Sequence, residues 1–231
     1  MIQQDLNFTV GRSEIFAVMG SSGCGKSTLM RSAIGLLKPV EGRIFFGDES
    51  FWDVGLEQQR ILMRSFGVMY QGGALWSSMS LAENVALPLT EFAQIDDKHA
   101  YELASLKLAL VGLAGFEDYY PAELSGGMRK RAAIARAMAL DPDTLFLDEP
   151  SAGLDPISSR NLDELIVRLR DSLGTTVVIV SHELYSILGI CDNSVFLDTE
   201  TSTMLASGNP RLLRDECENR QVRQFLTRGG Q

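Results

Sequence analysis

The segment Gly20-Ser-Ser-Gly-Cys-Gly-Lys26-Ser27-Thr28 constrains the fold of this chain more than any other feature. It fits the pattern G-x-x-x-x-G-K-[ST], and it lies between an apolar run, residues 15–19, and a segment of helical character, residues 26–37. Glycines let backbone N–H groups converge on phosphate oxygens, and a helix N-terminus adds the positive end of its dipole. A glycine turn that merely precedes a lysine would not need these flanks, so the pattern predicts a strand, a phosphate-binding loop and a helix.

In such a loop Lys26 lies on the β- and γ-phosphates, and the Ser27 hydroxyl lies on Mg²⁺. The predicted nucleotide contacts are Gly20, Ser21, Ser22, Gly23, Cys24, Gly25, Lys26, Ser27 and Thr28. For Cys24 we expect the backbone rather than the thiol to bind, and no redox role.

A second motif is an apolar run, residues 144–147, that ends in Asp148 and Glu149. Charge near a dry core is costly unless it meets a cation, so two acids at the end of a buried strand indicate a function. We expect Asp148 to hold Mg²⁺ through water, and Glu149 to act as general base or to position the attacking water. Two solvated acids are the alternative, which the phosphate loop in the same chain disfavours.

A third motif, Ser125-Gly126-Gly127, opens a helical run that extends to residue 140. The free N–H groups of a helix start make an anion site. One chain therefore holds two predicted phosphate-binding helix starts, although one ATP needs only one of them.

Continuous apolar runs at 144–147 and 175–180 are typical of strands that are buried on both faces of a parallel sheet. Residues 158–173 between them are amphipathic and long enough to be the crossover helix. Further strands are predicted at 42–46 and 66–70, a closing hairpin at 195–197 and 203–206, and helix over 81–113.

These elements predict an α/β fold with a mostly parallel core sheet in a single domain of 231 residues. We expect residues 1–71 and 141–208 to form the core, residues 72–140 a helical subdomain, and residues 209–231 a helical tail.

Composition excludes some functions. Lys and Arg number 21 against 30 Asp and Glu, a net charge of −9, which disfavours general nucleic-acid binding. Three widely spaced cysteines indicate neither a disulfide framework nor a zinc site. No secretory signal and no bilayer-spanning apolar stretch is seen, so any service to a membrane needs a partner.

The run LSGGMRKRAAIARAMALDPDTLFLDEP, residues 124–150, resembles the signature motif and Walker B region of ABC ATPases. The resemblance implies a P-loop ABC cassette in which the signature of one subunit covers the γ-phosphate held by another. The expected partner is thus a second copy of the chain, paired head to tail around two ATP.

Three more positions match this family in order and spacing. Gln71 falls at the Q-loop glutamine, which touches Mg²⁺ and senses the membrane subunit; Asp155 falls in the D-loop, and His182 at the switch histidine. A lone histidine after a strand is more often structural, but this set of motifs favours a γ-phosphate role. The resemblance implies that the chain is an ATPase with Lys26, Glu149 and His182 as catalytic residues, and Ser27, Gln71 and Asp148 as metal-binding ones.

The basic run Arg129, Lys130 and Arg131 follows the signature. Given the acidic chain we interpret it as a solvated helix face rather than a nucleic-acid site.

The chain departs from the family at its start. In this family an aromatic residue that stacks on adenine usually lies upstream of the loop, but counting back from Lys26 by the usual distance reaches Met1. Phe8 alternates with Leu6 and Val10, as a residue that points into the core does. We expect either a native start upstream of Met1 or a more loosely held adenine.

The stretch GGALWSSMSLAENVALPL with the regions around residues 125 and 150 is similar to ATPases of MCE-type, Mla-like lipid transporters. This implies phospholipid or lipid movement between bacterial membranes. The expected partners are an integral-membrane permease and an MCE-domain substrate-binding protein, and the expected location is the cytoplasmic face of the inner membrane. The alternatives are an importer ATPase for another small substrate, a soluble ABC ATPase, and a degenerate regulatory cassette, which Glu149 and His182 argue against. Trp76 and the apolar string 85–89 are expected to form the groove that receives a permease helix.

Overall fold

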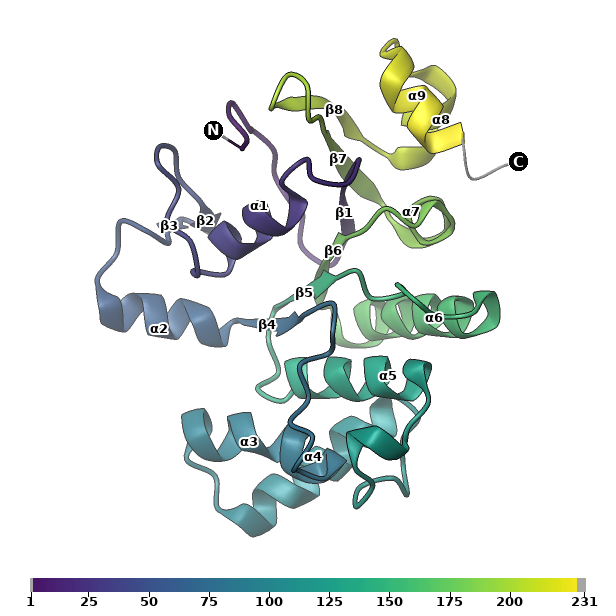
Figure 1. Ribbon diagram of the computed structural model, residues 1–231. Helices are drawn as coiled ribbons and strands as arrows, with labels where there is room; N and C mark the ends of the chain where they lie inside the picture. Colours follow the sequence, from purple (N-terminus) through teal and green to yellow (C-terminus); the bar gives the residue numbers. More distant parts are fainter. Residues whose placement is uncertain (1, 228–231) are drawn as a thin grey trace.

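A computed structural model describes residues 2–227, and it is built around a six-stranded sheet (Figure 1). The strand order is β4-β5-β6-β1-β7-β8, with every neighbouring pair parallel except the antiparallel pair β7–β8. The strands are β1 (Ile15–Gly20), β4 (Phe66–Met69), β5 (Thr144–Asp148), β6 (Thr176–Val180), β7 (Asn193–Leu197) and β8 (Met204–Gly208). The predicted mostly parallel α/β sheet and its closing hairpin are therefore confirmed.

Alternate residues of the central strand β1 enter two separate cores. Ile15, Ala17 and Met19 join one hydrophobic cluster, whereas Phe16 and Val18 join the other. Because side chains alternate across a strand, the sheet must be covered on both faces, which explains the continuous apolar runs. Helices α1 (Lys26–Ala33) and α2 (Leu56–Arg64) lie on one face, and α5 (Gly126–Ala137), α6 (Pro156–Leu173) and α7 (Leu184–Ile190) lie on the other (Figure 1).

The helical block predicted at 81–113 is two helices, α3 (Leu81–Ala93) and α4 (Asp97–Leu110). Helix α3 ends just before Gln94, which adopts a left-handed φ of 56°. Asp96 then caps α4 by accepting from the His99 N–H. Ser80 and Glu83 form a reciprocal capping box that starts α3. A short 3₁₀ turn, η1 (Pro121–Glu123), leads into α5, which packs with α3 and α4.

Helix α5, which packs with α3 and α4, comes very close to strand β4 at one point. A Cβ on Gly67 of β4 would lie 1.9 Å from the Ala137 carbonyl oxygen at the end of α5. Only glycine permits this approach of helix backbone to strand backbone.

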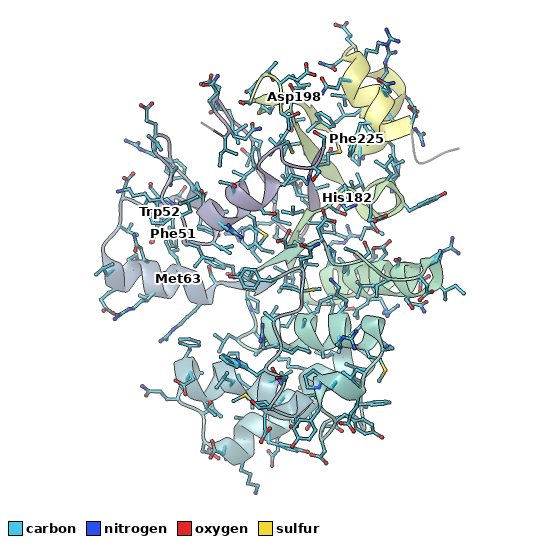
Figure 2. The ribbon with its side chains drawn as sticks, in the orientation of Figure 1. Phe51, Trp52, Met63, His182, Asp198 and Phe225 are labelled. Atoms are coloured by element: carbon cyan, nitrogen blue, oxygen red, sulfur yellow. The ribbon has the colours of Figure 1, made fainter. Side chains whose placement is uncertain are left out.

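The strand predicted at 42–46 is short. Only β2 (Phe45–Phe46) pairs, antiparallel to β3 (Glu49–Ser50), in a sheet of its own. Its Phe46 stacks on Phe66, and the neighbouring Phe51 and Trp52 pack edge to face (Figure 2). Phe8 stacks on Phe16, as the alternation predicts.

The predicted helical tail is α8 (Pro210–Glu216) and α9 (Arg220–Thr227), and its last four residues lie outside the described part. The Phe225 ring packs edge-on against Phe196 of β7, and the Gln221 amide donates to the Asp198 carboxylate at 2.6 Å (Figure 2). The tail is thus fixed to the sheet edge.

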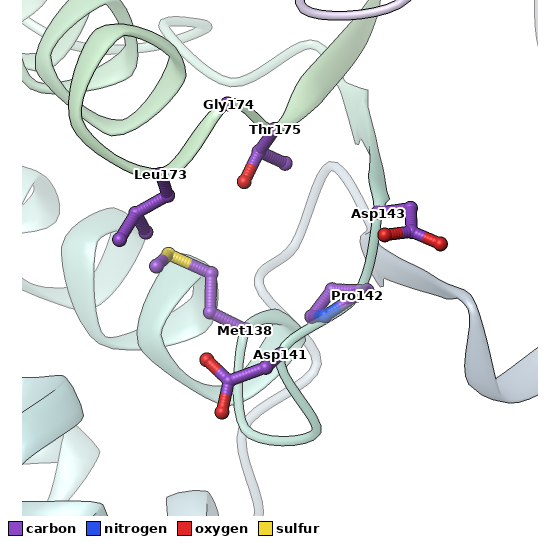
Figure 3. A pocket seen from close by; sticks show the side chains of 7 residues that line it. All are labelled: Met138, Asp141, Pro142, Asp143, Leu173, Gly174 and Thr175. Carbon is purple, nitrogen blue, oxygen red and sulfur yellow. The ribbon is translucent and has the colours of Figure 1, made fainter.

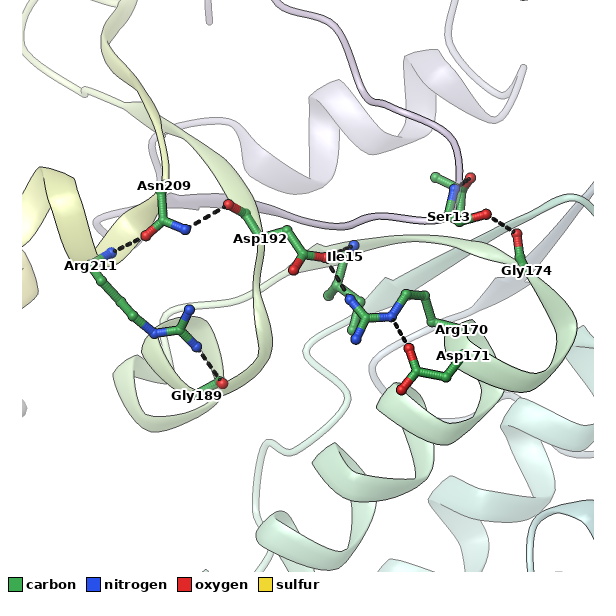
Figure 4. Close-up of polar contacts among 10 residues, drawn as sticks. Ser13, Ile15, Arg170, Asp171, Gly174, Gly189, Asp192, Asn209 and Arg211 are labelled. Atoms are coloured by element: carbon green, nitrogen blue, oxygen red, sulfur yellow. Dashed lines mark hydrogen bonds and ion pairs between the residues drawn. The ribbon is translucent and has the colours of Figure 1, made fainter.

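Asp192, just before β7, connects several elements (Figure 4). Its carboxylate accepts from the Ile15 N–H at 2.9 Å and from the Arg170 guanidinium at 2.7 Å, and its carbonyl accepts from the Asn209 amide at 2.9 Å. These contacts align β1 and β7 with α6 and the start of α8. Within residues 2–227 no helix has the length and apolar character needed to cross a membrane.

Candidate functional site

The predicted site residues meet where parallel strands end. β1 runs into the glycine loop at Gly20, β5 ends at Asp148, and His182 and Gln71 lie two residues beyond β6 and β4. Ligands of open α/β sheets bind outside the carboxyl ends of the strands, so the topology collects these groups at the edge that is used for binding. A cavity of about 170 Å³ lies at the opposite edge, and it contains no predicted site residue (Figure 3).

The glycine loop is closed around its lysine. The Lys26 ammonium donates to the carbonyls of Gly20 at 2.8 Å and Ser21 at 3.0 Å, and its side chain is buried. Gly25 caps α1 with a φ of 95°, a conformation that favours glycine. The first turn of α1 leaves the N–H groups of Lys26, Ser27 and Thr28 without acceptors in the helix, so they are available to an anion.

Glu149 is held in a strained backbone conformation beside His182. Its φ is 48°, and its N–H donates to the Val180 carbonyl at 2.8 Å. One carboxylate oxygen lies 2.7 Å from Nδ1 of His182, and the other accepts from the Ser181 hydroxyl at 3.4 Å. His182 itself is mostly exposed (Figure 2), so one end of this pair can reach a ligand.

Asp148 has the properties of a cation ligand. Burial raises the pKa of its carboxyl, and the neighbouring Glu149 raises it further, while the charges of Arg31, Lys130 and Lys26 act in the opposite direction. Its Oδ1 is buried and finds no hydrogen-bond partner among the described residues. A buried carboxylate oxygen without a partner is costly, and a hard cation would satisfy it. Mg²⁺ prefers oxygen ligands, and the predicted Ser27 hydroxyl and Gln71 amide would add two to this carboxylate.

Lys130 corrects the interpretation of the basic run. Instead of lying on a solvated face, it is buried, and its ammonium donates to the Gln71 carbonyl at 2.6 Å and to the Glu149 carbonyl at 3.1 Å. The Arg129 guanidinium donates to the Leu124 carbonyl at 2.6 Å. The sequence did contain a signal: position 130 shares a helix face with the buried Ala133 and Ile134, three and four residues later.

One of the signature residues, Gly126, lines a second cavity. This cavity, of about 210 Å³, is lined by Gln71, Gly72, Gly73, Gly126, Arg129, Lys130, Ala152, Gly153 and Leu154. The Ser125 hydroxyl accepts from the Met128 N–H and so caps α5, and Asp155 caps α6 by accepting from the N–H groups of Ile157 and Ser158. The structure therefore brings Ser125–Gly127 close to the residues that precede and follow Asp155.

The region expected to form a permease groove contains both exposed and buried residues. Trp76 is 58% exposed, but Val85 and Leu89 of the apolar string are buried within the helical subdomain. The Asn84 side chain holds the Trp76 backbone by accepting from its N–H at 2.7 Å and donating to its carbonyl at 3.0 Å. The two ends of the string are therefore core, its middle residues 86–88 are half-buried, and Trp76 is exposed.

Comparison with known proteins agrees with this geometry. A family model described as "ABC transporter" matches residues 3–152. The chain is 39% identical to the intermembrane phospholipid transport system ATP-binding protein MlaF of Escherichia coli K12, over 97% of the chain and 82% of that protein. It is 37% identical to the probable ribonucleotide transport ATP-binding protein mkl of Mycobacterium tuberculosis H37Rv, over 97% of the chain but only 62% of that protein's length.

Solved structures give the same result. A dimer of the ATP-binding cassette MJ0796 bound to ADP and Pi superposes with a TM-score of 0.79 at 27% identity, over 89% of each chain. The cbiO1 protein of Clostridium perfringens, part of the transporter complex cbiONQ, gives 0.83 at 29% identity, over 98% of this chain and 90% of that one. Family match, relatives and fold agree, and the chain belongs to the ABC transporter family.

Proposed function

We propose that this chain is the ATP-hydrolysing subunit of an ABC transporter, in which two copies enclose two ATP and drive a membrane permease. The observation that carries the proposal is the meeting of Lys26, Asp148, Glu149 and His182 at one edge of the sheet. A phosphate-binding loop, a carboxylate with a cation-seeking oxygen and a paired Glu–His are the parts that phosphoryl transfer to water needs.

Each residue has a separate role in this mechanism. The N–H groups of the α1 start and the Lys26 ammonium neutralise the phosphates, for which Lys26 exchanges loop carbonyls for phosphate oxygens. Glu149 accepts a proton from the attacking water or orients it, and His182, whose Nδ1 lies 2.7 Å from the Glu149 carboxylate, would contact the γ-phosphate. Ser27, Asp148 and Gln71 would hold Mg²⁺, whose charge neutralises phosphate oxygens when it is bound.

The second copy supplies the signature. Ser125 caps α5, and Gly126 of its first turn lines the second cavity together with Gln71 and Lys130. A partner's ATP is the ligand that we assign to Ser125, Gly126 and Gly127. Asp155 belongs to the same predicted interface. The dimeric MJ0796 cassette supports this pairing.

We further propose that the transported substrate is a phospholipid, that the permease belongs to an MCE-type system with an MCE-domain partner, and that the subunit acts at the cytoplasmic face of a bacterial inner membrane. The similarity to MlaF over nearly the whole chain supports this assignment. Nucleotide transport, which the name of mkl suggests, is the second candidate. The genes beside this one distinguish them: an MCE-domain protein and a permease are expected, and neighbours of nucleotide metabolism without either would contradict the lipid assignment.

The catalytic assignment is tested by two substitutions with different expected defects. Lys26→Ala should abolish productive ATP binding, whereas Glu149→Gln should bind ATP normally and lose about 10²-fold or more in kcat, the usual contribution of a general base. Exposed Glu164→Gln on α6 is the control, with wild-type values for both. Near-normal turnover of Glu149→Gln would remove the assignment.

A further inference from the structure

One buried side chain connects three parts of the proposed site. Lys130 lies one turn into α5, the helix that begins at the signature glycines, and it donates to the backbone carbonyls of Gln71 and Glu149. It is only 9% exposed. Helix α5, the loop after β4 and the end of β5 are therefore joined at a single ammonium group.

The chemistry of this contact calls for a cationic donor. Burial lowers the pKa of Lys130, and the carboxylates of Glu149 and Asp148 act in the opposite direction. A buried ammonium is tolerated only where its N–H groups are paired, and here two carbonyls accept from it. An apolar residue of equal length would fill the space but would leave both carbonyls without this donor.

The hydrogen bond to the Glu149 carbonyl supports a strained backbone conformation. Glu149 has a left-handed φ of 48°, which costs about 1 kcal/mol or more for a non-glycine residue and persists only where neighbours fix it. Its N–H is held by Val180 of β6 and its carbonyl by Lys130 of α5. Both peptide groups of the residue are thus fixed, and with them the direction in which its carboxylate leaves the backbone.

The Gln71 carbonyl is the other acceptor. The residue is exposed overall, and the bond to Lys130 takes only its backbone oxygen, so the amide side chain stays free for a ligand. Gln71 and Lys130 also both line the cavity of about 210 Å³ that separates the loop from the signature glycine Gly126.

We propose that Lys130 is a positioning residue. It links the position of helix α5 to the backbone conformation at Glu149 and in the loop that contains Gln71. Because the same helix starts with the signature glycines, a partner's ATP that pulls on the start of α5 moves the support of this chain's own Glu149. Occupancy of one ATP site is then transmitted to hydrolysis in the other through one side chain. This inference rests on the proposed function of Glu149.

The test compares Lys130→Met, Lys130→Arg and Lys107→Met in the full-length chain. Lys107 is also a buried lysine, but its ammonium pairs with Asp141, away from the site, which makes it a matched control. For Lys130→Met we expect kcat to fall about 10- to 100-fold, as for other residues that orient a reacting group, with the ATP dissociation constant changed less than about 2-fold. Lys130→Arg should restore kcat to within a few-fold, because guanidinium also donates to two carbonyls.

Lys107→Met should lower the melting temperature with kcat unchanged. A wild-type kcat in Lys130→Met, or a loss that Lys130→Arg does not restore, would overturn the inference. If Lys130→Met does not fold, Lys130→Gln takes its place, since its amide is shorter and uncharged and so cannot donate to both carbonyls as the ammonium does. An intermediate kcat is expected, and a wild-type kcat again contradicts the idea.

A double mutant separates this inference from the proposed function. On a Glu149→Gln background, adding Lys130→Met should lower the residual kcat by less than about 2-fold, because both changes remove the same contribution. A further loss as large as in the wild-type background means that Lys130 does not act through Glu149. Normal turnover of Glu149→Gln alone refutes the proposed function, whereas slow Glu149→Gln with normal Lys130→Met refutes only the role of Lys130.

Discussion

Asp163 on α6 is a titratable residue away from the proposed site whose environment sets a pH dependence. Burial raises the pKa of its carboxyl to about 6, although it accepts from the Ser186 hydroxyl at 2.8 Å, and its other oxygen has no partner among the described residues. In the unfolded chain an aspartate has a pKa of about 3.9. The folded state therefore binds the proton more tightly, and this contribution to stability is present below pH 4 and is lost as the pH rises through 6.

We expect Asp163→Asn to remove this dependence. The amide cannot ionise and still offers an oxygen to Ser186. The difference in the free energy of unfolding between variant and wild type should shift in favour of the variant by about 1 kcal/mol from pH 4.5 to pH 7.5, less than the full linkage value because the carboxyl is partly exposed. Urea unfolding at several pH values measures it. Exposed Glu164→Gln is the control, and a difference for Asp163→Asn that is constant with pH would contradict the shift.

Some residues of the proposed site could be predicted from the sequence, and others could not. Lys26, Asp148 and Glu149 were predictable because the glycine spacing and the acids at the end of an apolar strand are patterns that a phosphate site requires and a plain core does not. The role of Lys130 was missed because its partners are carbonyls, which every residue has, so no residue type in the sequence marks them. The left-handed φ of Glu149 could not be predicted either, because it is held by hydrogen bonds of backbone groups, which no residue type marks.

Between secondary-structure elements, the close contact of β4 with α5 predicts that a side chain at position 67 is destabilising. Gly67→Ala places a Cβ 1.9 Å from the Ala137 carbonyl oxygen, so strand and helix must separate. We expect a loss of about 3 kcal/mol or more in the free energy of unfolding, the upper range for overpacking.

Gly189→Ala in α7 is the matched control. A Cβ there meets nothing within 4 Å, so helix propensity should leave stability unchanged or raised by up to about 1 kcal/mol. Chemical unfolding of both variants measures the contrast. If Gly67→Ala were as stable as wild type, the close approach of the two backbones would be wrong.

Elements were predictable in proportion to their burial. β5 and β6 follow from apolar runs because both faces of the sheet are covered, and α6 follows from its amphipathic pattern. The break between α3 and α4 was missed, since apolar spacing continues through it and only the left-handed turn at Gln94 separates the helices. The strand over 42–46 shrank to two residues because its single partner, β3, is equally short.

At the scale of the whole molecule, Trp76 tests whether the helical subdomain meets a membrane partner. Its side chain is 58% exposed while its backbone is fixed by Asn84, so its replacement should cost less than about 1 kcal/mol of stability. We expect Trp76→Ala to keep ATP affinity but to weaken co-purification with the permease. Phe45→Ala, a similarly exposed aromatic on β2, is the control that should co-purify normally. Unfolding of isolated Trp76→Ala would mean that the residue serves packing.

Pairing of two chains gives a second prediction at this scale. With ATP bound and hydrolysis blocked, Glu149→Gln should accumulate as a dimer, because the enclosed ATP is not consumed. Size exclusion with and without ATP measures it, and a Glu149→Gln, Lys26→Ala double mutant should stay monomeric. A Glu149→Gln protein that remains monomeric at saturating ATP contradicts the ATP-enclosing dimer.

The strand order also governs how the chain is made. β1 leaves the ribosome well before its neighbours in the sheet, β6 and β7, which lie more than a hundred residues later in the chain. Until then its apolar residues on both faces have no partner strand, and the glycine loop at its end has no frame. Non-local pairing of this kind slows folding and exposes apolar surface to aggregation. The apolar faces of β1 in a nascent chain are therefore open to aggregation until β6 and β7 are synthesised, and nucleotide can stabilise the fold only after that point.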